Sequence, residues 1–170
     1  MDLLKADCMA ANPWSNYWRG RFWFVEKYME MNILEKESQL VEEFSGLSEW
    51  MDRYALLIEK GKTCPVLPDS EKNDSFLIKG CQSRVWIKAE LKEDGKVYFQ
   101  ADSDAVITKG IASMLLYVFS GEEPKAIVDA PVDFLDKIGL KEHLSPTRSN
   151  GLTAMLKQIK LYALALSMKK

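Results

Sequence analysis

The chain of 170 residues lacks an excess of charge of either sign, because 23 Lys and Arg residues nearly balance 25 Asp and Glu residues. Proteins that bind a nucleic-acid backbone do so through clustered positive charge, so the composition argues against a nucleic-acid partner. The chain also lacks an apolar run of about 18 residues, the length needed to cross a bilayer. We therefore expect a protein that is not embedded in a membrane.

Cysteine and histidine are scarce. The cysteines Cys8, Cys64 and Cys81 form no CxxC pair and no metal-ligand spacing, and His143 is the single histidine. An odd set of separated thiols is typical of a reducing compartment and argues against a disulfide framework or a zinc site. The first residues also lack the apolar segment and cleavage site of a secretory signal. We expect a cytoplasmic protein without a metal ion.

Several catalytic motifs are missing as well. The chain contains no HExxH, GxSxG or GxGxxG sequence and no phosphate-binding glycine loop. These motifs carry metal ligands, an activated serine or the backbone that cradles phosphates. Hydrolases and nucleotide-binding proteins of these kinds are therefore disfavoured.

The clearest candidate for chemistry is Cys81, in the polar stretch KGCQSR at residues 79–84. A cysteine with positive neighbours or oriented backbone amides has a lowered pKa and reacts as a thiolate, and Lys79 and Arg84 are close in sequence. The alternative is an inert thiol that packs beneath the loop. A Cys/His nucleophilic pair would need His143, which precedes a helix start where a structural role is commoner.

The chain divides at about residue 31. Residues 1–30 are crowded with aromatic side chains that follow neither a helical nor a strand period. We predict that they form an irregular extension or reflect an upstream start, and that residues 31–170 form a single domain. The alternative for the extension is an aromatic anchor for a partner or a membrane surface.

Apolar periodicity predicts the elements of the first half of this domain. It predicts two successive helices, or one kinked helix, between residues 32 and 61, followed by a surface loop that contains Cys64. Alternation predicts strands over residues 84–91 and 97–101, joined by a turn. The short apolar run at residues 76–80 predicts an edge strand.

The second half is predicted to be helical. Asp102 and Asp104 are interpreted as caps of a core helix, in preference to a pair of acid/base carboxylates. Ser145 and Pro146 are interpreted as the cap and first turn of the last helix. Helices, then strands, then helices, without βαβ alternation, predict an α+β fold: a three-stranded antiparallel sheet with helices packed mainly on one face.

Four segments carry a family resemblance. The sequences IKGCQSRVWI, ADSDAVITKGI, IGLKEHLSPTRSNGL and AMLKQIK, in this order, resemble the SufE family of sulfur-acceptor proteins, which includes the CsdE proteins. The resemblance extends from about Asn32 to Lys169 and implies a SufE/NifU-like fold. It also implies that Cys81 accepts sulfane sulfur from the persulfide of a cysteine desulfurase, stimulates that enzyme, and passes the sulfur to an iron–sulfur cluster scaffold.

The resemblance extends to further residues and to partners. It implies that Gln82 flanks the acceptor in a mobile loop, and that Asp104 and Arg148 lie near this loop and contribute to its surroundings or to docking. The implied partners are a SufS- or CsdA-like desulfurase and a SufBCD-like scaffold complex. Pyridoxal phosphate is expected on the desulfurase only, so no cofactor is expected on this chain, and a homodimer is left open.

Two further residues are interpreted separately. Cys64 lies outside the motifs and is expected to be a solvated loop cysteine, with a resolving thiol as the alternative. His143 lies within the third motif but is interpreted as structural. The alternative function is a stand-alone thiol enzyme, a Cys/His hydrolase or a thiol peroxidase, that uses Cys81 without a protein partner. A third alternative is an interaction module whose cysteine is inert.

Overall fold

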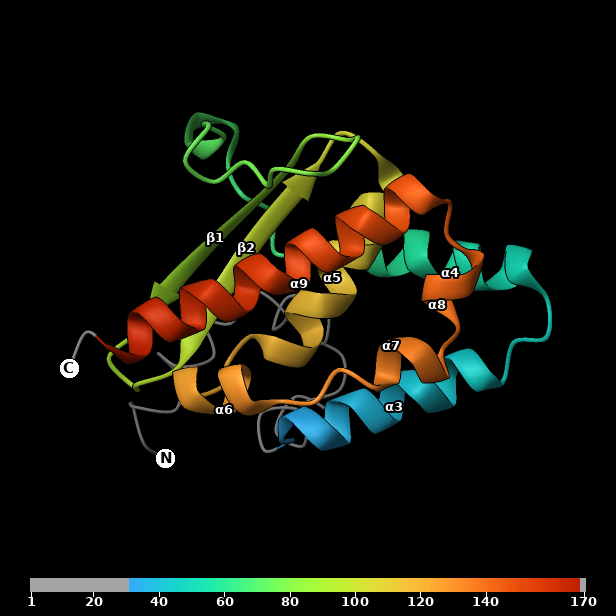
Figure 1. Ribbon diagram of the computed structural model, residues 1–170, viewed down its shortest axis with the longest axis horizontal. Coiled ribbons are helices and arrows are strands. Elements are labelled where there is room, and N and C mark those ends of the chain that lie inside the picture. The colour runs from blue at the N-terminus through green and yellow to red at the C-terminus, as the bar shows by residue number, and fades with distance from the viewer. Residues whose placement is uncertain (1–30, 169–170) are drawn as a thin grey trace, which may run out of the picture. The chain divides into compact units, whose positions relative to one another are not determined.

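The computed structural model describes residues 31–168, and its elements carry the labels of Figure 1. The predicted extension, residues 1–30, lies outside the described residues. In chain order, the elements are the helices α3 (Ile33–Ser45) and α4 (Trp50–Lys62), the 3-10 turn η1 (Asp69–Glu71), the strands β1 (Val85–Leu91) and β2 (Val97–Ser103), and the helices α5 (Val106–Phe119), α6 (Pro124–Asp129), α7 (Phe134–Lys137), α8 (Leu140–His143) and α9 (Pro146–Ser167).

The strands β1 and β2 form an antiparallel sheet in which Ile87 pairs with Ala101. Residues 76–80, predicted as a third strand, make only an isolated bridge and two backbone hydrogen bonds to β1. Gly80 then turns the chain away from the strand with a φ of 94°, a conformation that favours glycine. Within the described residues the sheet has two strands, which corrects the predicted three-stranded sheet.

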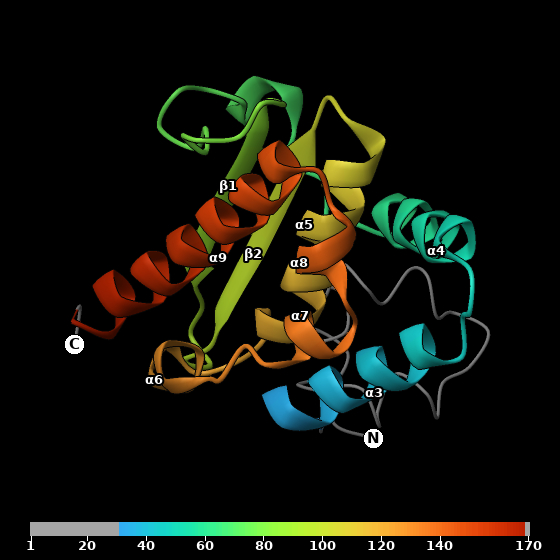
Figure 2. The same cartoon turned by 45° about the vertical axis from the view of Figure 1, so that its right-hand side comes forward.

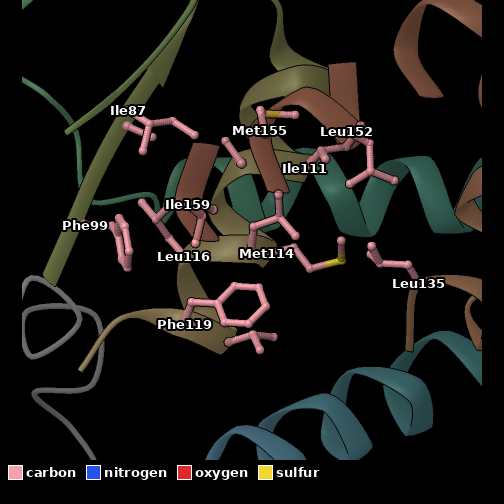
Figure 3. Close-up of a cluster of buried hydrophobic side chains, with 14 of the residues drawn as sticks. Ile87, Phe99, Ile111, Met114, Leu116, Phe119, Leu135, Leu152, Met155 and Ile159 are labelled. Atoms are coloured by element: carbon pink, nitrogen blue, oxygen red, sulfur yellow. The ribbon is translucent and has the colours of Figure 1, made fainter. Parts of the chain in front are cut away.

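The α+β class is confirmed, with helix α5 at the centre of the fold. Helix α5 contacts β2, α4, α3 and α9, and Figures 1 and 2 show α9 running along the sheet in front of α5. The core between these elements is apolar, and its burial is the main contribution to folding stability. Figure 3 shows part of it, and its labelled side chains are all buried: Ile87, Phe99, Ile111, Met114, Leu116, Phe119, Leu135, Leu152, Met155 and Ile159.

Helices α4 and α5 approach each other closely because glycine lies on both sides of their contact. A Cβ atom on Gly110 would lie 2.1 Å from the carbonyl oxygen of Leu57, and one on Gly61 would lie 3.1 Å from the amide nitrogen of Gly110. The Ser113 hydroxyl also donates a hydrogen bond of 2.7 Å to the carbonyl oxygen of Lys60. The carboxyl end of α4 is therefore held firmly against α5.

The predicted helix starts are confirmed in two of three cases. Asn32 forms a capping box with Glu35 at the start of α3, and α9 begins with Ser145 as its N-cap and proline in its first turn. The predicted caps of α5 are wrong, because the N-cap is Ala105 and no side chain caps this helix. None of the described helices is long and apolar enough to cross a membrane.

Candidate functional site

A cavity of about 350 Å³ lies where the loop before β1, the start of α5 and the first turns of α9 meet. In both views of the molecule the amino-terminal end of α9 lies beside the start of α5 (Figures 1 and 2). The four site residues singled out from the sequence, Cys81, Gln82, Asp104 and Arg148, all line this cavity. The fold thus brings together three segments that are far apart in the chain.

Cys81 is half-buried and rests on helix α9. Its thiol donates a hydrogen bond of 3.7 Å to the carbonyl oxygen of Gly151. A Cβ atom on Gly151 would lie 3.3 Å from the sulfur of Cys81, and one on Gly80 would lie 3.8 Å from the Cβ of Ala154. Small residues on α9 therefore leave the room in which the cysteine loop sits.

Burial raises the pKa of the Cys81 thiol above its ordinary value. This corrects the prediction that its sequence neighbours lower that pKa. Lys79 is exposed, and the Arg84 guanidinium lies over the Trp86 ring, 4.9 Å from its centroid. The group that faces the sulfur is a carbonyl, which accepts a hydrogen bond only from the protonated thiol. In this conformation Cys81 is therefore a shielded thiol rather than a thiolate.

Asp104 ties the end of the cysteine loop to the start of α5. Its Oδ1 atom accepts a hydrogen bond of 3.0 Å from the backbone N–H of Arg84, and its own backbone N–H donates to the carbonyl oxygen of Arg84. Asp104 and Arg148 are both exposed. Neither makes an ion pair with another described residue, so both charges are available to a ligand or partner.

Asp102 has a different role from Asp104, although one residue separates them. It lies in β2 and is buried. Its carboxylate oxygens form ion pairs with the Nζ atoms of Lys72, at 2.5 Å, and Lys109, at 2.9 Å. Burial opposes its ionisation, but the hydrogen bonds from these two lysines hold its pKa below the ordinary value. Asp102 does not line the Cys81 cavity. It is neither a helix cap nor half of an acid/base pair.

His143 lies against α4 and not against Cys81. Its ring stacks on Trp50 with 3.7 Å between the ring centroids, and its carbonyl oxygen accepts a hydrogen bond of 3.0 Å from the Tyr54 hydroxyl. His143 is not among the residues that line the cavity. The structure thus places it in a structural contact, away from the position that a Cys/His nucleophilic pair requires.

Cys64 is buried, which corrects its interpretation as a solvated loop cysteine. It is 5% exposed, and its thiol donates a hydrogen bond of 3.6 Å to the carbonyl oxygen of Ala101. Burial raises its pKa to about 12. A thiol that is both buried and protonated is a poor resolving thiol.

Gly151, whose lack of a side chain makes room for Cys81, was not predicted from the sequence as part of the site. The available signal was a glycine inside a run predicted as helix, which indicates a close approach by another group. Among the described residues, no cluster of three or more His, Cys, Asp or Glu side chains could hold a metal ion.

The chain is similar to proteins of one family. A family model described as SufE, an Fe-S metabolism associated domain, matches residues 38–163. A SufE-like protein of Rhizobium meliloti (strain 1021) is 39% identical over 127 residues, which cover 72% of this chain and 90% of that protein. The solution structure of a hypothetical protein from Thermus thermophilus matches with a TM-score of 0.65 and 26% identity, and the match covers 78% of this chain and 96% of that chain. The chain therefore belongs to the SufE family.

Proposed function

We propose that this protein accepts sulfane sulfur on Cys81 from the persulfide of a cysteine desulfurase and passes it to an iron–sulfur cluster scaffold. Membership of the SufE family associates the chain with iron–sulfur metabolism and implies an interaction with a cysteine desulfurase. The observation that carries the proposal is a half-buried cysteine that opens into a cavity of about 350 Å³. Such a cavity leaves space beside the thiol for an added sulfur atom.

The proposed reaction is an exchange between a thiol and a persulfide. The Cys81 thiolate attacks the outer sulfur of the donor persulfide, a new S–S bond forms on Cys81, and the donor cysteine leaves as a thiolate. The proton of the Cys81 thiol passes to solvent or to the partner. The step needs no metal or cofactor on this chain, and we assign pyridoxal phosphate to the desulfurase alone.

Delivery of Cys81 to a partner requires the loop to leave its seat on α9. The loop is anchored before the cysteine by the hydrogen bond from Ile78 to Val85 and after it by Asp104. Between these anchors, the thiol is held by its 3.7 Å contact with Gly151, which is weak and easily exchanged. We propose that residues 79–83 move as a unit, with the exposed Gln82 at their tip. Exposure in the partner's site would then allow Cys81 to ionise.

The surface around the cavity is suited to docking of the desulfurase. Val106 is 65% exposed, although it is apolar and lines the cavity together with the cysteine loop. The exposed charges of Asp104 and Arg148 flank it. An apolar contact with charges at its rim is a common arrangement in protein interfaces, so we assign Asp104 and Arg148 to docking as well as to the surroundings of the thiol.

The direct test is mass spectrometry of the protein after incubation with its cognate cysteine desulfurase and cysteine under non-reducing conditions. We expect the mass of one added sulfur atom on the Cys81 peptide. Cys81→Ser abolishes the addition, whereas Cys64→Ser, the matched control, keeps it. An unmodified Cys81 beside a desulfurase that is active in the same tube would refute the relay.

The rate of the desulfurase separates the remaining alternatives. If the protein is a relay, it accelerates alanine production by the desulfurase and Cys81→Ser removes this acceleration. Acceleration that survives Cys81→Ser would indicate an interaction module with an inert cysteine. Turnover of a small substrate without a partner, lost in His143→Gln, would indicate a thiol enzyme, but the stacking of His143 on Trp50 disfavours that outcome.

A further inference from the structure

We propose that the Cys81 cavity also binds small thiols and disulfides of the α-amino-acid class, such as cysteine and cystine, with Arg148 taking their carboxylate and Asp104 their ammonium group. The inference rests on the proposed use of Cys81 as the reactive thiol. It adds a small-molecule reactant to a site that is otherwise assigned to protein partners. The same thiol would then exchange sulfur with the pool of free cysteine.

The cavity has the volume and the mixture of apolar and polar lining residues that such a ligand needs. Its volume of about 350 Å³ lies within the range of about 300–1,000 Å³ that is typical of small-molecule sites. Ile111 and Val106 supply apolar lining, and Ser83 and Thr108, whose hydroxyls lie 3.3 Å apart, supply polar groups. This volume is large enough for a molecule the size of cysteine.

The charges of the cavity match a zwitterion. Arg148 and Asp104 both line it, carry opposite charges, and make no ion pair with another described residue. The hydrogen bond from the Arg84 N–H uses one carboxylate oxygen of Asp104 and leaves the other for an ammonium group. Guanidinium groups bind carboxylates through paired hydrogen bonds. An α-amino acid presents both counter-charges in one small molecule.

Asp102, two residues before Asp104, is an acidic residue whose charge is already neutralised within the protein. Asp102 is also close to the start of α5, but two lysine ammonium groups already neutralise it within the protein. Asp104 has no such ion pair among the described residues. The charge of Asp104, which lines the cavity, is thus available to an external group, whereas the charge of Asp102 in β2 is not.

The proposed exchange balances without an added oxidant or reductant. The thiolate of free cysteine attacks the outer sulfur of the Cys81 persulfide, and an S–S bond forms on the small molecule. The S–S bond to Cys81 breaks, Cys81 leaves as a thiolate, and the product is cysteine persulfide. With cystine, the Cys81 thiolate attacks one sulfur, a mixed disulfide forms, and one cysteine leaves as a thiolate.

The test compares three disulfides as probes of the full-length protein. Cystine carries both charged groups, cystamine lacks the carboxylates, and dithiodipropionate lacks the amines. The rate of mixed-disulfide formation at Cys81 is followed by peptide mass spectrometry. Each rate is divided by the rate of the same reagent with Cys81 in the urea-unfolded chain, which removes differences in intrinsic reactivity.

We expect the normalised rate to be highest for cystine, by up to about fivefold over each analogue, as one exposed charged contact per missing group predicts. A general attraction to positive charge would instead put dithiodipropionate first, because it is the anion. Arg148→Gln should remove the advantage of cystine over cystamine, and Asp104→Asn its advantage over dithiodipropionate. Lys157→Gln removes an exposed cation of α9, the helix that carries Arg148, and Glu90→Gln removes an exposed carboxylate of β1. These matched controls should leave the order of the three normalised rates unchanged.

Equal normalised rates for the three reagents would overturn this inference, as would an equal loss in the control variants. The outcome is independent of the sulfur relay. Preference for cystine without sulfur transfer from a desulfurase would leave the amino-acid site standing and refute the relay. Sulfur transfer without that preference would do the reverse.

Discussion

The two described cysteines have the same kind of hydrogen-bond acceptor but different surroundings. Cys64 and Cys81 each donate to a backbone carbonyl oxygen, of Ala101 at 3.6 Å and of Gly151 at 3.7 Å. Cys64 is enclosed by the core, and burial raises its pKa to about 12, whereas Cys81 is half-buried and lines a cavity. Solvent access, and not the hydrogen bond, therefore distinguishes Cys81 from Cys64.

The segments that carry the two thiols also differ in how tightly they pack against the rest of the domain. Cys64 follows the carboxyl end of α4, which the close contact between Gly61 and Gly110 locks against α5. Cys81 sits on a loop that touches α9 at Gly151, where an added Cβ atom would meet the Cys81 side chain, at 3.3 Å from its sulfur, and no backbone atom. Exposure of Cys64 requires an opening of the core, whereas exposure of Cys81 would require only the loop movement proposed above.

The largest expected effect is on the rates of alkylation of the two cysteines. In the native protein we expect iodoacetamide to modify Cys81 about a thousandfold faster than Cys64, because the buried thiol must wait for an opening of the core. Peptide mass spectrometry over time measures both rates in one sample. The two rates should become similar in denaturant, and similar rates in the native protein would refute the distinction.

The next largest effect concerns the support of Cys64. Gly110→Ala places a Cβ atom 2.1 Å from a backbone oxygen of α4, so we expect the free energy of unfolding to fall by about 3 kcal/mol or more. Urea unfolding followed by circular dichroism measures the change. Gly46→Ala, where a Cβ would make only ordinary contacts at 3.8 Å or more, is the matched control. A fall no greater than that of the control would contradict the close-packing argument.

A smaller effect of a different kind is expected at the support of Cys81. Gly151→Ala places a Cβ atom 3.3 Å from the sulfur, which displaces the loop thiol rather than the backbone. We expect alkylation of Cys81 to rise about threefold as the thiol leaves its carbonyl partner. The free energy of unfolding should stay within about 1 kcal/mol of the parent, because alanine is a better helix former than glycine. Faster modification of Cys64 as well would indicate general loosening instead.

The smallest expected effect is on the pH dependence of Cys81 alkylation. Because burial raises its pKa, less thiolate is present at any given pH than for an ordinary thiol, so the midpoint of the rate profile should lie at higher pH in the native protein than in the unfolded chain. Gly151→Ala should move this midpoint back toward the unfolded value. A native midpoint below the unfolded one would mean that cations around the loop outweigh burial.

Local sequence signals predicted those parts of the fold that local chemistry determines. The helical pattern from residue 32 and the Ser145-Pro146 pair mark real helix starts, and alternation together with a turn at Gly95 marks the β1–β2 hairpin. The prediction of a third strand was wrong because the path of the chain in the folded domain limits its pairing with β1. Residues 76–80 have the composition of a strand, but Gly80 turns them away after two hydrogen bonds.

The site was predicted through the family resemblance more than through local chemistry. The motifs predicted that Gln82, Asp104 and Arg148 lie near the loop of Cys81, and in the structure these residues line one cavity with it. Their roles in sulfur transfer and docking stay predictions. The raised pKa of Cys81 could not be predicted from its sequence neighbours, because it comes from burial against α9 and the Arg84 side chain lies over Trp86.

The burial of Cys64 could not be inferred from its neighbours in the chain. The residues that follow it run beside β2, where the N–H of Ala101 donates to the carbonyl oxygen of Pro65 and the N–H of Leu67 donates back to Ala101. These pairs join segments that are far apart in the sequence. The segment around Cys64 therefore has the composition of a surface loop, although Cys64 and Leu67 pack in the core.

The contact between Cys81 and Gly151 joins residues 70 positions apart, and this separation has a consequence for protein synthesis. A ribosome makes Cys81 well before it makes α9, so the nascent chain carries the thiol for a time without the helix that shelters it. The site is therefore one of the last parts of the domain to be completed. A chain that ends prematurely before α9 would keep the acceptor cysteine but lose both its shelter and one wall of its cavity.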